Sequence, residues 1–452
     1  MSSKSPRLLV YSIITLLVMS YCFGLIPPYG DGVGYHFLYR QLRIGNWSLM
    51  SPLNPPPAEG EYMYAPAREE WSTYYQIGAP IVWALAAPMT SVAQSLIGQF
   101  VTQHPEAPYS APFLADGLII LTVTLLLAIG ILLLTVRIVM HTSGASPRLA
   151  WIAAAAAFFG LPTWYYFIYG AATSHIVELF VLTAALSVWW IAHQRISYPL
   201  LALSSALIGY AALVRIDALL FLLPLGIASI RRFPCLRRTV LALLPAVFVC
   251  AIQMLIWLHL FGTFLPPHTY TLNRFVLPAR YGYEILFSGT RGLFAWSPVA
   301  AIGVIGLIGA LKMAKYRFFA LIGISTLLLY IFFYGSWEMW WGGLLFGQRF
   351  LIPLYPFIAV GIALFLQSAM ALPRGLRLGV YGFLGIIIGY AMTLTLVYPF
   401  VGRTFHNMEF QTPWQIFSLA RTEYGFFNRT AFTSMFQTMF WHGPRFIHLF
   451  TP

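Results

Sequence analysis

The chain has 452 residues, of which 59% are hydrophobic and 9% are charged. A soluble globular domain carries about 25% charged residues, so this composition excludes a soluble enzyme. The 17% aromatic content excludes a disordered chain, because so much apolar surface does not stay in water. The sequence therefore predicts an all-α polytopic membrane protein.

The first predicted span covers residues 8–26 and follows Lys4 and Arg7. It is longer than the core of a signal peptide and lacks a small-residue cleavage pattern, so we expect it to be retained. Further apolar runs of spanning length cover residues 114–136, 149–169, 172–192, 240–261, 299–311, 318–333, 351–370 and 378–399.

The apolar run 199–230 is too long for one crossing, and basic residues flank both of its ends. Basic flanks on both sides require two crossings with a turn at 215–217. Each arm has about 16 residues, or roughly 24 Å of helix, which is shorter than a hydrocarbon core of about 30 Å. The turn, with Arg215 and Asp217, is therefore expected inside the outer half of the membrane.

Residues 77–100 contain Pro80 and Pro88 and lead into a loop without Lys or Arg. A crossing here would place Arg137 and Arg148 outside, against the positive-inside rule, so we interpret the segment as a re-entrant or surface-lying hairpin. About eleven spans result, with the N-terminus inside and the C-terminus outside. Fourteen basic residues and no acid then lie inside, so the net charge of +13 reflects topology and needs no nucleic-acid partner.

This topology divides the chain into a transmembrane domain, 1–399, and a C-terminal outer segment, 400–452. Within the domain, residues 27–112 form a large first outer loop with short surface helices. The outer segments are long and the inner loops are short, so any chemistry is expected at the outer face. No internal repeat is visible, which disfavours the inverted-repeat transporters.

Asp31 lies directly after the first span, in the glycine-rich segment 28–36. Glycines let the backbone turn sharply at the membrane surface and leave the carboxylate accessible. A carboxylate there can deprotonate a hydroxyl group, as group transfer to an alcohol requires. The alternative is a turn aspartate without chemistry.

Three arginines are candidates for binding the phosphate of a membrane lipid. Arg215 and Asp217 form an ionisable pair at membrane depth, which is costly and marks a polar cavity. The alternative is a structural ion pair that pins the turn, and it would mark a polar cavity as well. Arg291 and Arg349 each precede a span that runs inward, and a guanidinium group at that depth suits a phosphate. Snorkelling to lipid headgroups is the alternative for each single arginine.

Other clusters favour ordinary explanations. His175 and Glu178 are three residues apart and share a helix face, but no third ligand is nearby, so no metal site is expected. The aromatic clusters 164–167 and 337–341 suit an interfacial belt, with sugar stacking as the alternative. The three cysteines have no metal-ligand spacing and predict no disulfide framework.

Five motifs, in this order, resemble the GT-C superfamily of integral-membrane glycosyltransferases: residues 30–32, 75–80, 213–217, 291–298 and 346–350. More narrowly, they resemble the bacterial branch related to dolichyl-phosphate-mannose protein mannosyltransferases and aminoarabinose transferases. The resemblance extends from about Asp31 to Pro356. It implies a polyprenyl-phosphate-linked sugar donor and an acidic base in the first outer loop, a role that falls on Asp31.

This sequence departs from the family pattern at Gly32, where many members have a second acid. The departure leaves open whether Asp31 acts alone. The residues that are candidates for assisting it are Asp217, Glu69, Glu70 and His36.

The sequence thus predicts a glycosyltransferase that moves a sugar from a polyprenyl phosphate to an acceptor hydroxyl of a glycan, lipid or protein. Asp31 would be the base, and Arg215, Arg291 and Arg349 would bind the phosphate, without a metal or cofactor. The expected location is the outer face of a bacterial inner membrane. The alternatives are a transporter or flippase of lipid-linked sugars, and a non-catalytic GT-C-like assembly subunit.

Overall fold

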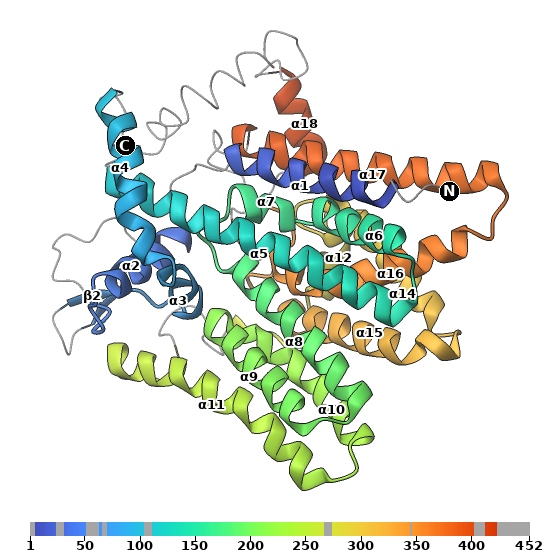
Figure 1. Ribbon diagram of the computed structural model, residues 1–452, viewed down its shortest axis with the longest axis horizontal. Helices are drawn as coiled ribbons and strands as arrows, with labels where there is room; N and C mark the ends of the chain where they lie inside the picture. The colour runs from blue at the N-terminus through green and yellow to red at the C-terminus, as the bar shows by residue number, and fades with distance from the viewer. Residues whose placement is uncertain are drawn as a thin grey trace.

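The structure is a computed structural model in which long helices run side by side (Figure 1). It describes residues 5–23, 31–50, 63–65, 70–103, 111–265, 274–343, 346–401 and 412–422. Among these described residues, six helical segments are long and apolar enough to cross a membrane: Phe113–Ser143, His175–Arg195, Leu236–Phe261, Ala314–Gly335, Arg349–Ala369 and Arg374–Pro399. The chain is therefore an integral membrane protein, as the composition predicted.

These six segments belong to α5 (Ala111–Ser143), α8 (His175–Arg195), α11 (Leu236–Phe261), α15 (Ala314–Gly335), η4 (Arg349–Leu354) with α16 (Tyr355–Ala369), and α17 (Arg374–Val401). Shorter helices of the bundle are α1 (Ser5–Phe23), α6 (Pro147–Gly160), α9 (Tyr198–Val214), α10 (Leu222–Arg232) and α14 (Val299–Ala310). Ten of the eleven expected spans fall on one of these helices, whereas the expected span 149–169 is divided between α6 and a short helix, α7 (Thr163–Ile168), because the chain breaks at Leu161 and Pro162. The number of crossings and their sidedness remain predictions.

The run 199–230 forms two helices that meet at the expected turn. Helix α9 ends at Val214, Arg215 is extended with φ −155° and ψ 125°, and η2 (Ile216–Phe221) leads into α10. At 1.5 Å per residue, α9 is about 26 Å long, slightly less than a hydrocarbon core. Arg215 and Asp217 are both buried, so the turn holds its charged groups inside the protein.

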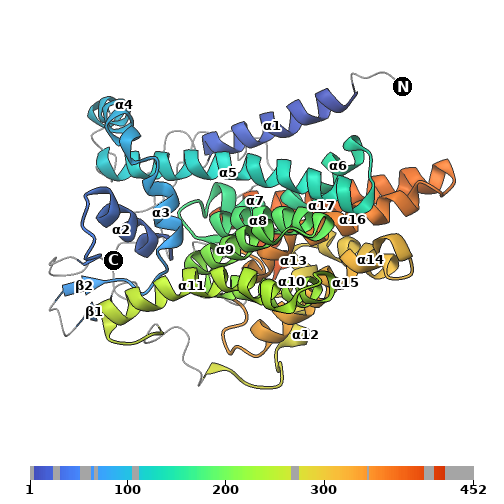
Figure 2. The same cartoon turned by 60° about the horizontal axis from the view of Figure 1, so that its bottom comes forward.

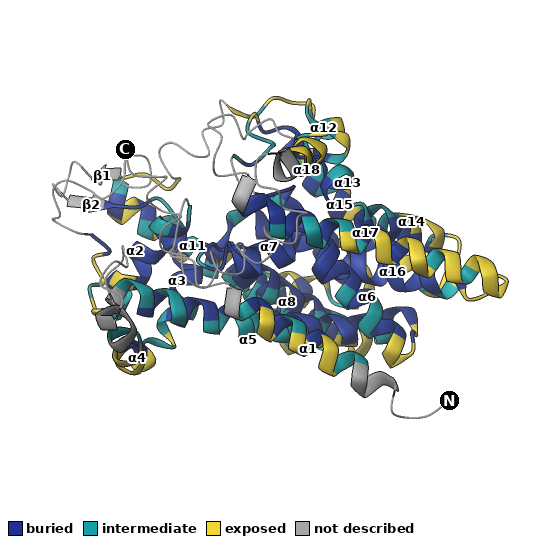
Figure 3. Ribbon diagram, turned by 90° about the horizontal axis from the view of Figure 1, so that it is seen from above, coloured by how far each residue is buried: buried dark blue, intermediate teal, exposed yellow. Residues whose placement is uncertain are grey.

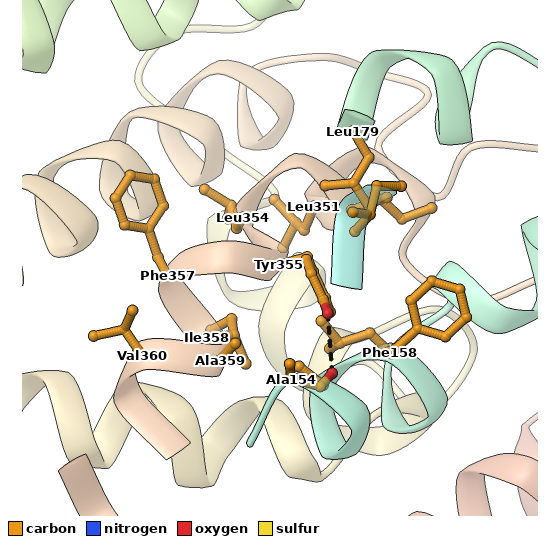
Figure 4. Close-up of a cluster of buried hydrophobic side chains, with 14 of the residues drawn as sticks. Ala154, Phe158, Leu179, Leu351, Leu354, Tyr355, Phe357, Ile358, Ala359 and Val360 are labelled. Atoms are coloured by element: carbon orange, nitrogen blue, oxygen red, sulfur yellow. Dashed lines mark hydrogen bonds between the residues drawn. The ribbon is translucent and has the colours of Figure 1, made fainter. Parts of the chain in front are cut away.

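The centre of the bundle is closely packed and largely buried (Figure 3). Helices α14 and α16 touch backbone to backbone, because a Cβ atom added at Gly306 would overlap the carbonyl oxygen of Gly361. Small residues permit this close approach between membrane helices. Next to this contact, the Tyr355 hydroxyl donates to the Ala154 carbonyl at 3.0 Å, which satisfies a polar group within an apolar cluster (Figure 4).

The described parts of the segment between α1 and α5, which is the predicted first outer loop, gather at one end of the bundle as short elements (Figure 2). They are α2 (Asp31–Arg43), β1 (Met63–Ala65), β2 (Glu70–Ser72), α3 (Gly78–Ala84), η1 (Ala87–Met89) and α4 (Thr90–Gln103). The strands pair antiparallel, with Tyr64 opposite Trp71, and add a small hairpin to an otherwise helical chain. The segment 77–100 forms α3, η1 and most of α4, and α3 has too few residues to cross a membrane.

The remaining short helices are α7 (Thr163–Ile168), α12 (Gly282–Phe287), α13 (Leu293–Trp296) and α18 (Pro413–Thr422). Helix α18 packs back onto α17, where the rings of Tyr390 and Phe417 are 5.7 Å apart. Of the predicted C-terminal segment 400–452, the structure describes residues 400–401 and 412–422. The division at residue 399 remains a prediction.

Candidate active site at the start of α2

Asp31 is the first residue of α2, where the helix dipole favours a negative charge. Two glycines fix the position of this helix end. A Cβ atom at Gly32 would lie 3.2 Å from the Cβ of Ala172, and one at Gly34 would overlap the ring of Tyr75. Glycine at these positions therefore lets α2 lie close to the chain around Ala172 and to the Tyr75 side chain. The position of the family's second acid is sterically crowded here.

Two long-range partners hold the Asp31 carboxylate. The Tyr75 hydroxyl donates to Oδ1 at 3.1 Å, and Arg349 Nη1 donates to Oδ2 at 2.7 Å. Burial by itself would raise the pKa of Asp31, but the charge of Arg349 and the hydrogen bond from Tyr75 outweigh it and hold the pKa below its usual value. The side chain is still 31% exposed, so the site presents an ionised carboxylate that a second molecule can reach.

Arg349 is the first residue of η4. Its side chain contacts Asp31 of α2, which lies 318 positions earlier in the sequence. The preceding loop turns at Gly342 and Gly347, whose φ angles of 75° and 59° favour glycine. Arg349 Nη1 binds Asp31, whereas its Nε is buried and has no hydrogen-bond partner among the described residues. A buried donor without a partner is rare in folded proteins and requires an explanation.

A second guanidinium group lies close to this pair. Arg215 Nε is 3.2 Å from Glu178 Oε2 and 3.3 Å from Asp217 Oδ1, and Nη2 donates to the Tyr334 hydroxyl at 3.2 Å. The charge of Arg215 also lowers the pKa of Asp31. The structure thus brings three predicted site residues, Asp31, Arg215 and Arg349, into one charged cluster, with Asp217 beside Arg215.

Arg291 belongs to a different cluster. Its side chain is fully buried, Nη1 donates to the Thr290 carbonyl at 2.7 Å, and Nη2 donates to the Tyr398 hydroxyl at 3.3 Å. The guanidinium also lies 4.8 Å from the Trp296 ring centroid. These contacts link α13 to α17, which is a structural use of the side chain. Its predicted role in phosphate binding stays a prediction.

His36 lies five residues after Asp31, and at 100° per residue it points to another face of α2. Its Nε2 is 3.1 Å from Asp116 Oδ2, and Arg43 binds the other oxygen of Asp116. Burial lowers the pKa of His36 and outweighs the opposite effect of Asp116. His36 is therefore held by Asp116 of α5 and does not contact Asp31.

The other two assisting candidates are not placed at Asp31. Glu69 lies outside the described residues, and Glu70 is the first residue of β2. Within the described ranges, no group of three or more His, Cys, Asp or Glu side chains is arranged to hold a metal ion. His175 and Glu178 do share the first turn of α8, but Glu178 is directed to Arg215.

Three contributors to these clusters were not identified from the sequence. Tyr75 stood within a motif without a role, Asp116 was hidden in an apolar run, and Glu178 was considered only as a metal ligand. The available signal was the burial of an acid in an apolar helix, which requires a positive partner. Nothing in the sequence indicated which arginine that partner would be.

No protein-family model matches the sequence, and no curated protein is significantly similar to it. The structure is similar to the crystal structure of ArnT from Cupriavidus metallidurans bound to undecaprenyl phosphate, with a TM-score of 0.55 and 14% identity over 88% of this chain and 66% of that one. For ArnT in the apo state the TM-score is 0.55, with 16% identity over 90% of this chain and 67% of ArnT.

A weaker similarity, with a TM-score of 0.45 and 12% identity, relates 91% of the chain to 58% of the Archaeoglobus fulgidus oligosaccharyltransferase in the apo form. The chain spans about two thirds of the length of ArnT. The likeness to ArnT confirms the predicted fold: this is an integral-membrane protein with the GT-C fold.

Proposed function

We propose that the protein is a glycosyltransferase that moves a sugar from a polyprenyl-phosphate donor to the hydroxyl group of an acceptor. The observation that carries this proposal is the partly exposed Asp31 carboxylate, held between Tyr75 and Arg349 with Arg215 close by. A hydroxyl-activating base next to two phosphate-binding cations is what such a reaction needs.

In the proposed reaction, a carboxylate oxygen of Asp31 takes the proton of the acceptor hydroxyl. The acceptor oxygen then bonds to the anomeric carbon of the sugar, while the bond between that carbon and the phosphate oxygen breaks. The polyprenyl phosphate leaves with the bonding electron pair. Arg349 and Arg215 offset the negative charge that grows on the phosphate in the transition state.

Arg349 can contact both the base Asp31 and the phosphate of the donor. Its Nη1 holds Asp31 at 2.7 Å, and its buried Nε has no partner among the described residues. A guanidinium group presents several donors in one plane, so it can bind the carboxylate and a phosphate oxygen together. The sugar donor and the base Asp31 would thereby be held at a fixed distance and orientation, which favours the reaction.

The fold supports a donor of this class, because the similar ArnT structure contains bound undecaprenyl phosphate. We further propose that the site faces the outside of a bacterial inner membrane, with the N-terminus cytoplasmic and residues 400–452 outside. Charge segregation supports this orientation. Reporter fusions should place Ser143 and Arg374 inside and Tyr281 outside. The opposite pattern would overturn the orientation.

The test of function is transfer by the purified protein from a mixed pool of polyprenyl-phosphate sugars, followed by mass analysis of candidate glycan, lipid and protein acceptors. We expect an acceptor mass increase of one sugar and the release of polyprenyl phosphate. Movement of the intact lipid-linked sugar from one leaflet of a vesicle membrane to the other, without transfer of the sugar to an acceptor, would identify a flippase instead. Absence of both activities would favour the assembly subunit.

A further inference from the structure

Phe350 lies next to both arginines of the charged cluster. The guanidinium carbon of Arg215 is 5.7 Å from the centroid of its ring, and that of Arg349 is 5.4 Å from it. Both distances are within the range of a cation–π interaction. The two guanidinium groups thus lie near the same aromatic ring, although Arg215 and Arg349 come from distant parts of the chain.

Tyr334, at the end of α15, supports this ring from behind. The rings of Tyr334 and Phe350 are stacked at 4.2 Å with an interplanar angle of 5°, and Trp337 packs against Phe350 at 5.4 Å. The Tyr334 hydroxyl also accepts the hydrogen bond from Arg215 Nη2. Tyr334 and Phe350 are 2% and 3% exposed, so they form a rigid floor beneath the two cations.

The stacked rings of Tyr334 and Phe350 counteract the electrostatic repulsion between Arg215 and Arg349. Two neighbouring guanidinium groups in a poorly solvated place repel each other, even though Arg349 is paired with Asp31 and Arg215 lies beside Glu178 and Asp217. The negative face of an aromatic ring attracts both, and the hydrogen bond to Tyr334 fixes one of them. Glu178 and Asp217 hold the Nε edge of Arg215 from the other side.

We propose that Phe350, stacked on Tyr334, is a positioning residue that holds Arg215 and Arg349 together as one binding site for the phosphate of the donor. This inference rests on the proposed function, because it specifies how the phosphate of that donor is held. Phe350 acts through the arginines, and it does not need to touch the substrate.

The test is equilibrium binding of undecaprenyl phosphate to the detergent-solubilised full chain. Phe350→Leu keeps an apolar side chain but removes the aromatic face, and we expect the dissociation constant to rise about tenfold. Phe350→Tyr keeps the ring and should bind like the wild type. Tyr334→Phe keeps the stack but loses the hydrogen bond to Arg215, and we expect a rise of about fivefold.

Phe357→Leu is the matched control. Phe357 is 1% exposed and packs against the rings of Phe221 and Phe319, at 5.8 and 5.5 Å. Its replacement should lower the melting temperature about as much as Phe350→Leu, with lipid binding unchanged. Equal binding by Phe350→Leu and the wild type, or an equal loss in both leucine variants, would overturn the inference.

If Phe350→Leu does not fold, Tyr334→Phe decides the question: weaker binding supports the inference, and wild-type binding overturns it. The result is separable from the test of function. A wild-type protein that binds the lipid in this pattern but transfers no sugar contradicts only the proposed reaction. A protein that transfers sugar but binds the lipid equally well after Phe350→Leu contradicts only the positioning role.

Discussion

Helix α2 carries two ion clusters on two of its faces, and they differ in what surrounds the carboxylate. On one face, Asp116 is bound by both His36 and Arg43, and its side chain is 1% exposed. At the start of the helix, Asp31 is bound by Tyr75 and Arg349, and its side chain is 31% exposed. Both carboxylates have two partners, but a second molecule can reach only Asp31.

The difference separates a structural ion pair from a candidate reactive group. The cluster around Asp116 joins α2 to α5 and leaves neither carboxylate oxygen without a partner. Around Asp31, the partner Arg349 has a buried Nε without a hydrogen-bond partner in the described part of the chain, and Arg215 is close by. The cluster around Asp116, here called the sealed cluster, is buried and fully paired, as is typical of a contact that stabilises a fold. The cluster around Asp31, here called the open cluster, is partly exposed and has a donor without a partner among the described residues, which fits a ligand site.

The largest expected effect is that of Asp31→Asn on transfer. Asparagine has nearly the same shape but does not accept a proton at neutral pH, so loss of general-base catalysis should lower the transfer rate about 10² to 10⁴-fold. The melting temperature should change little, because the residue is at a partly exposed helix end. Single-turnover transfer and thermal unfolding of the same preparation measure both.

Asp116→Asn is the matched variant from the sealed cluster, and it should behave in the opposite way. It removes the charge that Arg43 and His36 share, so the melting temperature should fall while the folded fraction transfers sugar at the wild-type rate. A large loss of turnover in folded Asp116→Asn would break the distinction between the two clusters. So would wild-type turnover in Asp31→Asn.

The second prediction concerns the charges around Arg215. Arg215→Met leaves buried carboxylates without their cation, which should cost about 3 to 5 kcal/mol of stability. If the pair of Arg215 and Asp217 were purely structural and stood alone, adding Asp217→Leu should restore the melting temperature. The structure changes this expectation, because Glu178 is fully buried and also 3.2 Å from Arg215 Nε. We expect recovery only when Glu178→Gln is added as a third change.

Thermal unfolding of the single, double and triple variants tests this prediction. A double variant as stable as the triple would show that Glu178 does not destabilise the protein once Arg215 is absent. Transfer should not return in the triple variant, because the guanidinium group is still missing. Return of both stability and transfer would show that Arg215, Asp217 and Glu178 have a purely structural role.

The fold was predictable because membrane burial and charge segregation leave strong local signals. The turn at Arg215 could be placed from the basic residues that flank the run 199–230. The side-chain partners could not, since Asp31 meets Tyr75 44 positions and Arg349 318 positions along the chain. Such contacts depend on how helices pack, which no local pattern specifies.

The third prediction uses the pKa of Asp31, which its environment holds below the usual value. A base acts in its ionised form, so kcat/KM of the wild type should fall only at a pH below the ordinary range of aspartate. Arg349→Gln removes the main stabilising charge, so the pKa of Asp31 rises and the acidic limb moves to higher pH.

The pH profile of kcat/KM measures this shift independently of the lower activity of the variant. Arg291→Gln is the control, because Arg291 binds Thr290 and Tyr398 and belongs to the other arginine cluster. Its acidic limb should stay at the wild-type position. An unchanged limb in Arg349→Gln would mean that Asp31 is not the group whose ionisation limits the reaction.

The smallest expected effect separates the two partners of Asp31. Tyr75→Phe removes one hydrogen bond from an uncharged donor and keeps the ring that packs against Gly34, so the transfer rate should fall only about threefold. The acidic limb should move in the same direction as in Arg349→Gln but by less, because a hydroxyl dipole stabilises the carboxylate less than a full charge does. Tyr210→Phe is the control, since it removes a tyrosine hydroxyl that donates to the Gly78 carbonyl instead of to Asp31. If the loss in Tyr75→Phe equals that in Asp31→Asn, then Tyr75 takes part in the chemistry itself, and the open cluster has two reacting groups where the structure suggests one.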